Sequence, residues 1–211
     1  MIRTISISAE SLENVTDEIG ELLTPQVVAG LDPNLDHAPA FPSYDLTETF
    51  ELWIIDYDDL TSYSREQPAK QVPRFSGRLH HQVRQGEQVI AYARSDGSDI
   101  GKMALDQFID SPLARAIDEA VTVLDNLEQE DPRLRDADLL VRLLVMPALQ
   151  AHAFWLSGET RYSDWVLLID GPDKFAEVSR SELLRFDSFI QLLKTLKPAA
   201  GIRPTLEFSD S

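Results

Sequence analysis

GRLHHQVRQGEQVIAYARS, residues 77–95, consists of two β-rich runs that meet at Gln85-Gly86. A glycine between runs of alternating apolar and polar side chains is typical of the turn of a β-hairpin. Leu79, His81 and Val83 share one face of the first run, as every second residue of a strand does. A second hairpin is predicted in WLSGETRYSDWVLLID, residues 155–170, with its turn at Gly158.

Three other segments carry apolar residues at helical spacing. The first follows Ser8, a candidate N-cap, and has acidic residues in its first turns. The second begins at Pro112, a favoured first helical residue, and ends at Asp131-Pro132. The third is predicted over residues 180–197, where Ser179 could cap the first turn.

Strand pairs separated by helices predict an α+β fold. We expect a largely antiparallel sheet, built from two hairpins plus extra strands and covered by about three helices. The extra strands are residues 2–7, residues 49–57 and the apolar run 139–156, which is one bent strand or two because Pro147 interrupts it. We divide the chain into four parts. Residues 1–23 are an N-terminal strand and acidic helix, and residues 24–45 are a Pro-rich docked arm. Residues 46–198 are the main α+β domain, and residues 199–211 are a C-terminal tail.

The 211 residues include no cysteine, so disulfides, thiolate metal sites and cysteine nucleophiles are excluded. A cysteine-free chain suits a reducing compartment, and no secretory signal is visible at residues 1–11. Charged and polar residues such as Arg142 and His152 interrupt the apolar run, which is therefore interpreted as core and not as a membrane span. We expect a cytoplasmic protein.

Charge is unevenly distributed along the chain. The net charge is −17, and residues 1–60 hold thirteen acidic side chains against Arg3 alone, which leaves −12 there. Such a field repels polyanions, so nucleic acids and anionic membranes are disfavoured as partners.

Residues 65–84 form a basic island, in which five cations stand against Glu66 alone. Arginine together with aromatic residues is enriched at protein interfaces. The island could neutralise the acidic N-terminal region within the same molecule, or it could dock an acidic partner or another copy of the chain. The candidate partner-binding residues are Arg65, Lys70, Arg74, Phe75, Arg78 and Arg84.

Two pairs of aspartates raise the possibility of a metal site. Asp56 and Asp58 follow one apolar strand two residues apart, and Asp170 and Asp173 follow another. Carboxylates at strand ends can bind a divalent ion or act in acid–base chemistry. The simpler interpretation is that these are turn residues in an acid-rich chain.

Other catalytic signatures fail on spacing. SDGSDIGKMAL, residues 95–105, resembles a phosphate loop, but its glycines are too close together and Met103 stands where a hydroxyl should hold magnesium. His80 and His81 point to opposite faces of a strand and cannot easily bind one ion. No G-x-S-x-G motif is present.

The sequence therefore favours a non-enzymatic interaction or assembly protein without a cofactor. It would dock a protein partner or its own copies through the basic island and the acidic N-terminal region. The alternative is a small divalent-metal-dependent hydrolase or nuclease that uses the four aspartates. A third hypothesis, suggested by the net charge alone, is an acidic decoy that occupies nucleic-acid-binding proteins in place of nucleic acid.

Overall fold

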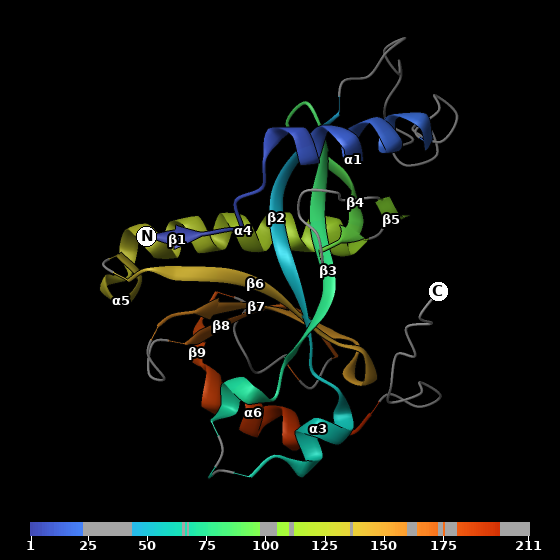
Figure 1. The fold of residues 1–211 in the computed structure, drawn as a ribbon. Helices are drawn as coiled ribbons and strands as arrows, with labels where there is room; N and C mark the ends of the chain where they lie inside the picture. Colours follow the sequence, from blue (N-terminus) through green and yellow to red (C-terminus); the bar gives the residue numbers. More distant parts are fainter. Residues whose placement is uncertain are drawn as a thin grey trace. The chain divides into compact units, whose positions relative to one another are not determined.

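The computed structural model describes two compact units, drawn in Figure 1. The N-terminal unit comprises residues 4–51 and 77–119, and the C-terminal unit comprises residues 1–3, 52–76 and 120–211. The described residues are 1–22, 44–64, 66, 68–97, 105–109, 112–135, 137–159, 164–172, 175 and 181–198.

The fold is α+β with a mostly antiparallel sheet, as predicted. In the N-terminal unit the strands are hydrogen-bonded in the order β5-β4-β3-β2. Its elements are α1 (Ala9–Leu22), β2 (Asp45–Ile54), β3 (Arg74–Gln85), β4 (Gln88–Asp96), β5 (Leu105–Ile109) and the first turns of α4 (Pro112–Glu130).

The predicted hairpin is the β3–β4 pair. Gly86 in its turn has a φ of 60°, a left-handed conformation that glycine adopts without steric cost. The antiparallel register places Arg78 opposite Asp96 and His81 opposite Ala93.

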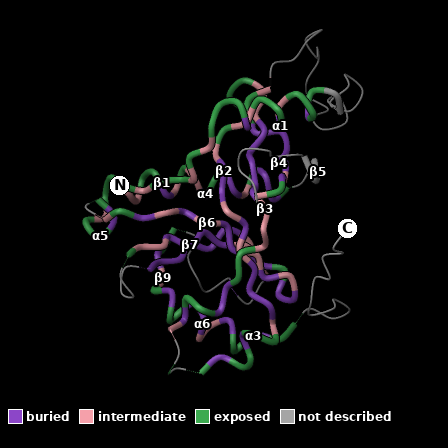
Figure 2. The backbone as a smooth tube through the Cα atoms, viewed as in Figure 1, coloured by how far each residue is buried: buried purple, intermediate pink, exposed green. Residues whose placement is uncertain are grey.

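Helix α1 packs on one face of this hairpin. Ser8 caps the helix, because its hydroxyl oxygen accepts the Ser11 N–H at 3.2 Å. Val15 and Ile19 are fully buried, one turn apart on the face that meets the sheet. Figure 2 shows the outward side of α1 as exposed. On the strands, Val15 and Ile19 pack with the apolar residues Leu79, Val83, Ile90, Ala91 and Ala93.

The first turns of α4 lie on the other face of the same strands. Alternation along β3 turns Gln82 away from His81. The side-chain amide of Gln82 donates to the Ala114 carbonyl in α4 at 3.0 Å. Both faces of the N-terminal unit's sheet are thus covered by helix.

In the C-terminal unit the strands are hydrogen-bonded in the order β2-β6-β7-β8-β9, and β1 pairs in parallel with β6. Its strands are the last residues of β2 together with β1 (Ile2–Arg3), β6 (Leu139–Met146), β7 (Ala151–Ser157), β8 (Trp165–Asp170) and β9 (Leu183–Arg185). Its helices are the later turns of α4 together with α3 (Tyr57–Ser62), η1 (Ala69–Gln71), α5 (Pro132–Arg135), η3 (Pro147–Leu149) and α6 (Phe186–Lys194).

The core of the C-terminal unit lies between its sheet and the helices α3, η1 and α6. Residues Leu144, Trp155 and Val166 on three adjacent strands share one buried face. Phe189 and Leu193 of α6 are fully buried against it. Figure 2 shows β7 as buried along most of its length.

The apolar run 139–156 forms two strands. η3 separates β6 from β7, and Gln150 then adopts a φ of 51°, which reverses the chain. Strands β7 and β8 form the antiparallel pair predicted for residues 155–170. Among the described helices, none is long and apolar enough to cross a bilayer.

Three predicted elements differ from the structure. The predicted strand 2–7 is reduced to Ile2–Arg3, and the predicted strand 49–57 is Asp45–Ile54. The helix predicted over 180–197 begins only at Phe186, because Leu183–Arg185 pair with β8 as an edge strand. An apolar stripe fits either geometry over three residues, and the tertiary partner decides between them.

Several predictions fall outside the described residues. The Pro-rich arm 24–45 does so except for Tyr44 and Asp45, as does the whole tail 199–211. The candidate cap Ser179 is also outside.

Replacement of the Ser8 cap tests the N-terminal unit. Ser8→Ala removes the acceptor for the Ser11 N–H and should lower the free energy of unfolding by about 1 kcal/mol. Ser8→Asp, which restores an acceptor, should retain the wild-type value. Urea unfolding of both variants measures the difference, and equal losses in the two would show that the side chain does not act as a cap.

Candidate functional site

The residues of the predicted basic island are divided between the two units. Lys70, Arg74 and Phe75 belong to the C-terminal unit. Arg78 and Arg84 belong to the N-terminal unit, and Arg65 lies outside the described residues. The local partners of each group therefore decide what it can do.

Arg84 is engaged within the N-terminal unit. Its guanidinium forms an ion pair with Asp118 of α4 and donates to the Glu87 carbonyl at 3.1 Å. Arg84 therefore joins the hairpin to α4.

Arg74 makes a two-pronged contact with a buried carboxylate. Its Nε and a terminal nitrogen lie 2.9 and 2.7 Å from Oδ2 of Asp56, whose side chain is only 9% exposed. The Arg74 side chain itself remains 44% exposed. The guanidinium therefore pairs with Asp56 and remains accessible at the surface.

A row of stacked side chains crosses the sheet of the C-terminal unit next to Arg74. It starts in the core at Trp155, which lies directly opposite Arg142 in the β6–β7 register. The Arg142 guanidinium carbon is 4.7 Å from the ring centroid of Trp155 and 4.5 Å from that of Trp53. The Trp53 ring then contacts Phe75, with the centroids 5.8 Å apart. We call Trp155, Arg142, Trp53 and Phe75 the Phe75 row.

The Phe75 row leads from the core to the surface. Trp155 is 2% exposed, Trp53 is half-buried and Phe75 is 38% exposed. Among the described residues, Phe75 and Met1 are the large apolar side chains that are exposed. Aromatic and arginine side chains at such a position are the composition of protein-binding hot spots.

Lys70 and Arg142 both act on the carboxyl group of Asp164. Burial raises the pKa of the Asp164 carboxyl, and the Gly158 N–H bond together with the charges of Lys70 and Arg142 partly opposes this shift. Because its pKa is raised, the Asp164 carboxyl group binds a proton more readily than an exposed aspartate does. Lys70 is exposed, so its ammonium group is available at the surface.

The four candidate metal ligands are not brought together in the part of the chain that the structure describes. Asp56 precedes α3 and Asp58 lies within it, so the expected strand geometry for this pair is wrong. Asp170 ends β8, where its Oδ1 accepts the Gly171 N–H at 2.7 Å. Asp173 is outside the described residues, and the others form no group of three acidic or histidine side chains able to hold an ion. The four-carboxylate site stays a prediction.

His81 has the inward, hydrogen-bonded position that the sequence predicted. Nδ1 is 2.9 Å from the Thr49 hydroxyl and Nε2 is 2.7 Å from the Ser95 hydroxyl. All three residues are buried, and burial lowers the pKa of His81 to about 4. The buried serine hydroxyl and imidazole are therefore closed to a substrate and serve to connect strands β2, β3 and β4.

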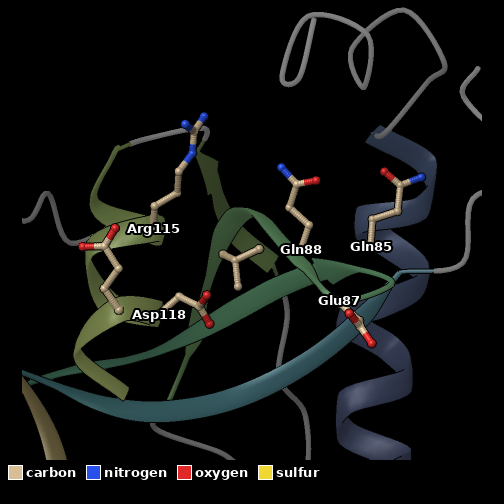
Figure 3. A pocket seen from close by; sticks show the side chains of 7 residues that line it. Gln85, Glu87, Gln88, Arg115 and Asp118 are labelled. Atoms are coloured by element: carbon tan, nitrogen blue, oxygen red, sulfur yellow. The ribbon is translucent and has the colours of Figure 1, made fainter. Parts of the chain in front are cut away.

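A polar pocket of about 650 Å³ opens in the N-terminal unit (Figure 3). Arg115 and Asp118 of α4 line one side, and Gln85 and Gln88 of the hairpin line the other. Asp118 is already paired with Arg84. With acidic, basic and amide groups all present, the lining does not select one ligand chemistry.

Sequence reasoning missed the buried part of the Phe75 row. In the sequence, Arg142 interrupts an apolar run, and Trp53 and Trp155 lie in predicted strands. An arginine inside an otherwise apolar strand is itself a signal, because a buried guanidinium needs partners. The identity of those partners depends on which strands become neighbours.

The buried His81 should make stability fall in mild acid. The neutral form is favoured in the folded state, while the unfolded chain binds a proton near pH 6.5. The stabilisation is therefore complete above pH 6.5 and is lost as the pH falls towards 4, by about 3 kcal/mol at most. His81→Gln should remove this part of the slope in urea unfolding between pH 7 and 4, and an unchanged slope would contradict the assignment.

Arg74 should contribute to stability despite its exposure. Arg74→Leu leaves the buried Asp56 carboxylate without its cation and should cost about 1–3 kcal/mol. In the double variant Asp56→Asn/Arg74→Leu the loss should be smaller than the sum of the single losses, because the two residues interact directly. Strict additivity in urea unfolding would show that the pair is energetically unimportant.

No protein family, curated protein or solved structure matches this chain. Its own side chains must therefore indicate its function. Of the features described above, the Phe75 row ends in a partly exposed ring, and it lies within a single unit.

Proposed function

We propose that this chain is a non-enzymatic docking protein that binds an acidic segment of a protein partner on its C-terminal unit. The binding surface is a docking patch made of Trp53, Lys70, Arg74, Phe75 and Arg142. The observation that carries the proposal is the 38% exposure of Phe75 at the end of a row of stacked rings.

The patch has the chemistry of a protein interface. Phe75 and Trp53 supply apolar area that is already ordered by the Arg142 stack, so little side-chain entropy is lost on binding. Rigid aromatic residues flanked by arginine are the groups that dominate binding energy in protein complexes. A partner should therefore present at least one apolar side chain to Phe75.

Charge selects an acidic segment. Lys70 is exposed, Arg74 is half-exposed, and Arg142 lies in the row itself. Two opposite charges about 4 Å apart near a protein surface attract by about 4 kcal/mol before desolvation. Charges beyond a Debye length of about 8–10 Å are largely screened at cellular ionic strength, so the chain's overall negative charge opposes contact much less.

The basic island therefore acts through its C-terminal-unit residues. Arg84, in the N-terminal unit, is ion-paired with Asp118 and 23% exposed, whereas Arg74, although ion-paired with Asp56, is 44% exposed. Lys70, Arg74 and Phe75 are the island residues that contribute to the docking patch.

Selection from a library of displayed random peptides tests the proposal. The full-length protein should enrich peptides that combine Asp or Glu with an aromatic residue or leucine. Phe75→Ser should weaken the selected peptides by about tenfold or more, the loss expected for an interface anchor. Lys70→Glu should weaken them by a similar factor through charge repulsion.

Arg115→Glu is the matched control for Lys70→Glu. It makes the same change of charge on an exposed cation of α4, outside the docking patch. It should leave the peptide affinities unchanged, and melting curves should show that all three variants fold. Enrichment of basic or neutral peptides, or equal losses for Lys70→Glu and Arg115→Glu, would refute the proposal.

A further inference from the structure

Helix α1 carries an acidic stripe on the side opposite its buried face. Glu10, Glu13, Asp17 and Gly20 are all exposed. At 3.6 residues per turn these four positions fall within about 80° of arc. The residues that pack on the sheet, Val15 and Ile19, lie on the other side of the helix.

Gly20 is the unexpected member of this stripe. Glycine inside a helix is less stable than alanine. A Cβ at Gly20 would meet no atom within 4 Å, so packing within the unit does not require glycine there. The absence of a side chain does, however, allow a flat ring from outside to approach the helix backbone closely.

We infer that the acidic segment bound by the docking patch is the α1 stripe of a second copy of this chain. The inference rests on the proposed function and names its partner. Glu13 and Asp17 supply carboxylates for the cations of the patch, and Gly20 leaves room for the Phe75 ring. The chain thus carries both halves of a complementary pair of surfaces.

The dimensions of the two surfaces agree. The stripe rises by about 10 Å from Glu13 to Gly20 at 1.5 Å per residue. The row from Phe75 through Trp53 to Arg142 advances in steps of 5.8 and 4.5 Å, which also reach about 10 Å at most. With a ring placed against Gly20, Asp17 and Glu13 lie about 4.5 and 10 Å further along the helix axis, within the range that the row spans.

The contact joins unlike surfaces, which defines a decisive experiment. A patch variant, Lys70→Glu/Phe75→Ser, keeps an intact stripe, and a stripe variant, Glu13→Lys/Asp17→Lys, keeps an intact patch. Sedimentation of the full-length wild-type chain should show concentration-dependent dimers or larger species. Each variant alone should associate at least about tenfold more weakly. An equimolar mixture of the two should form a one-to-one heterodimer, because one intact surface of each kind remains.

Substitution of Gly20 gives a second, independent readout. Gly20→Ala should raise the melting temperature of the dilute chain, because alanine is the better helix former. The same change should weaken self-association, and Gly20→Leu should weaken it further. Asn14→Ala, at an exposed position beside the stripe, is the control, which should raise helix stability and leave association unchanged.

The failure of this inference is distinguishable from the failure of the proposed function. A monomeric wild-type chain that still binds acidic peptides through Phe75 would overturn the second copy as partner and leave the docking function intact. Association that survives both variants, or a mixture that fails to form heterodimers, would also overturn the inference. Absence of both self-association and peptide binding would refute both.

Discussion

The contact of Arg142 with two indole rings joins β6 to its neighbouring strands in the C-terminal unit. Arg142 is half-buried on the face of β6 that also carries the buried Leu144, and partial burial of a guanidinium is costly unless it is compensated. Trp53 and Trp155 supply that compensation from the neighbouring strands, and the Ser157 hydroxyl accepts a hydrogen bond at 3.0 Å. Each cation–π contact of this kind is worth about 0.5–2 kcal/mol.

The same stacking creates the docking patch. Because Arg142 contacts Trp53 and Trp53 contacts Phe75, the exposed ring is connected to the core by a continuous set of contacts. Phe75 is exposed at the start of β3, and its sequence neighbour Arg74 is paired with Asp56. An ordered, partly apolar surface with adjacent cations results, in a chain that is acidic elsewhere.

Polar groups with catalytic potential are used here for structure. His81 connects Thr49 to Ser95 inside the sheet of the N-terminal unit, and Asp56 holds Arg74 in the C-terminal unit. Buried polar groups paired in this way fix the positions of strands and loops. The docking function proposed for the protein requires strands and loops in fixed positions. It does not require a reactive centre.

The sequence by itself determined the α+β class, both hairpins, the Ser8 cap and the inward position of His81. These features depend on residues within about twenty positions of one another, where alternation, helical spacing and turn chemistry are informative. The tertiary structure alone decided that residues 183–185 form a strand, and that residues 53, 75, 142 and 155 form one row. Such contacts follow from strand order and register, and local patterns do not encode which distant strands become neighbours.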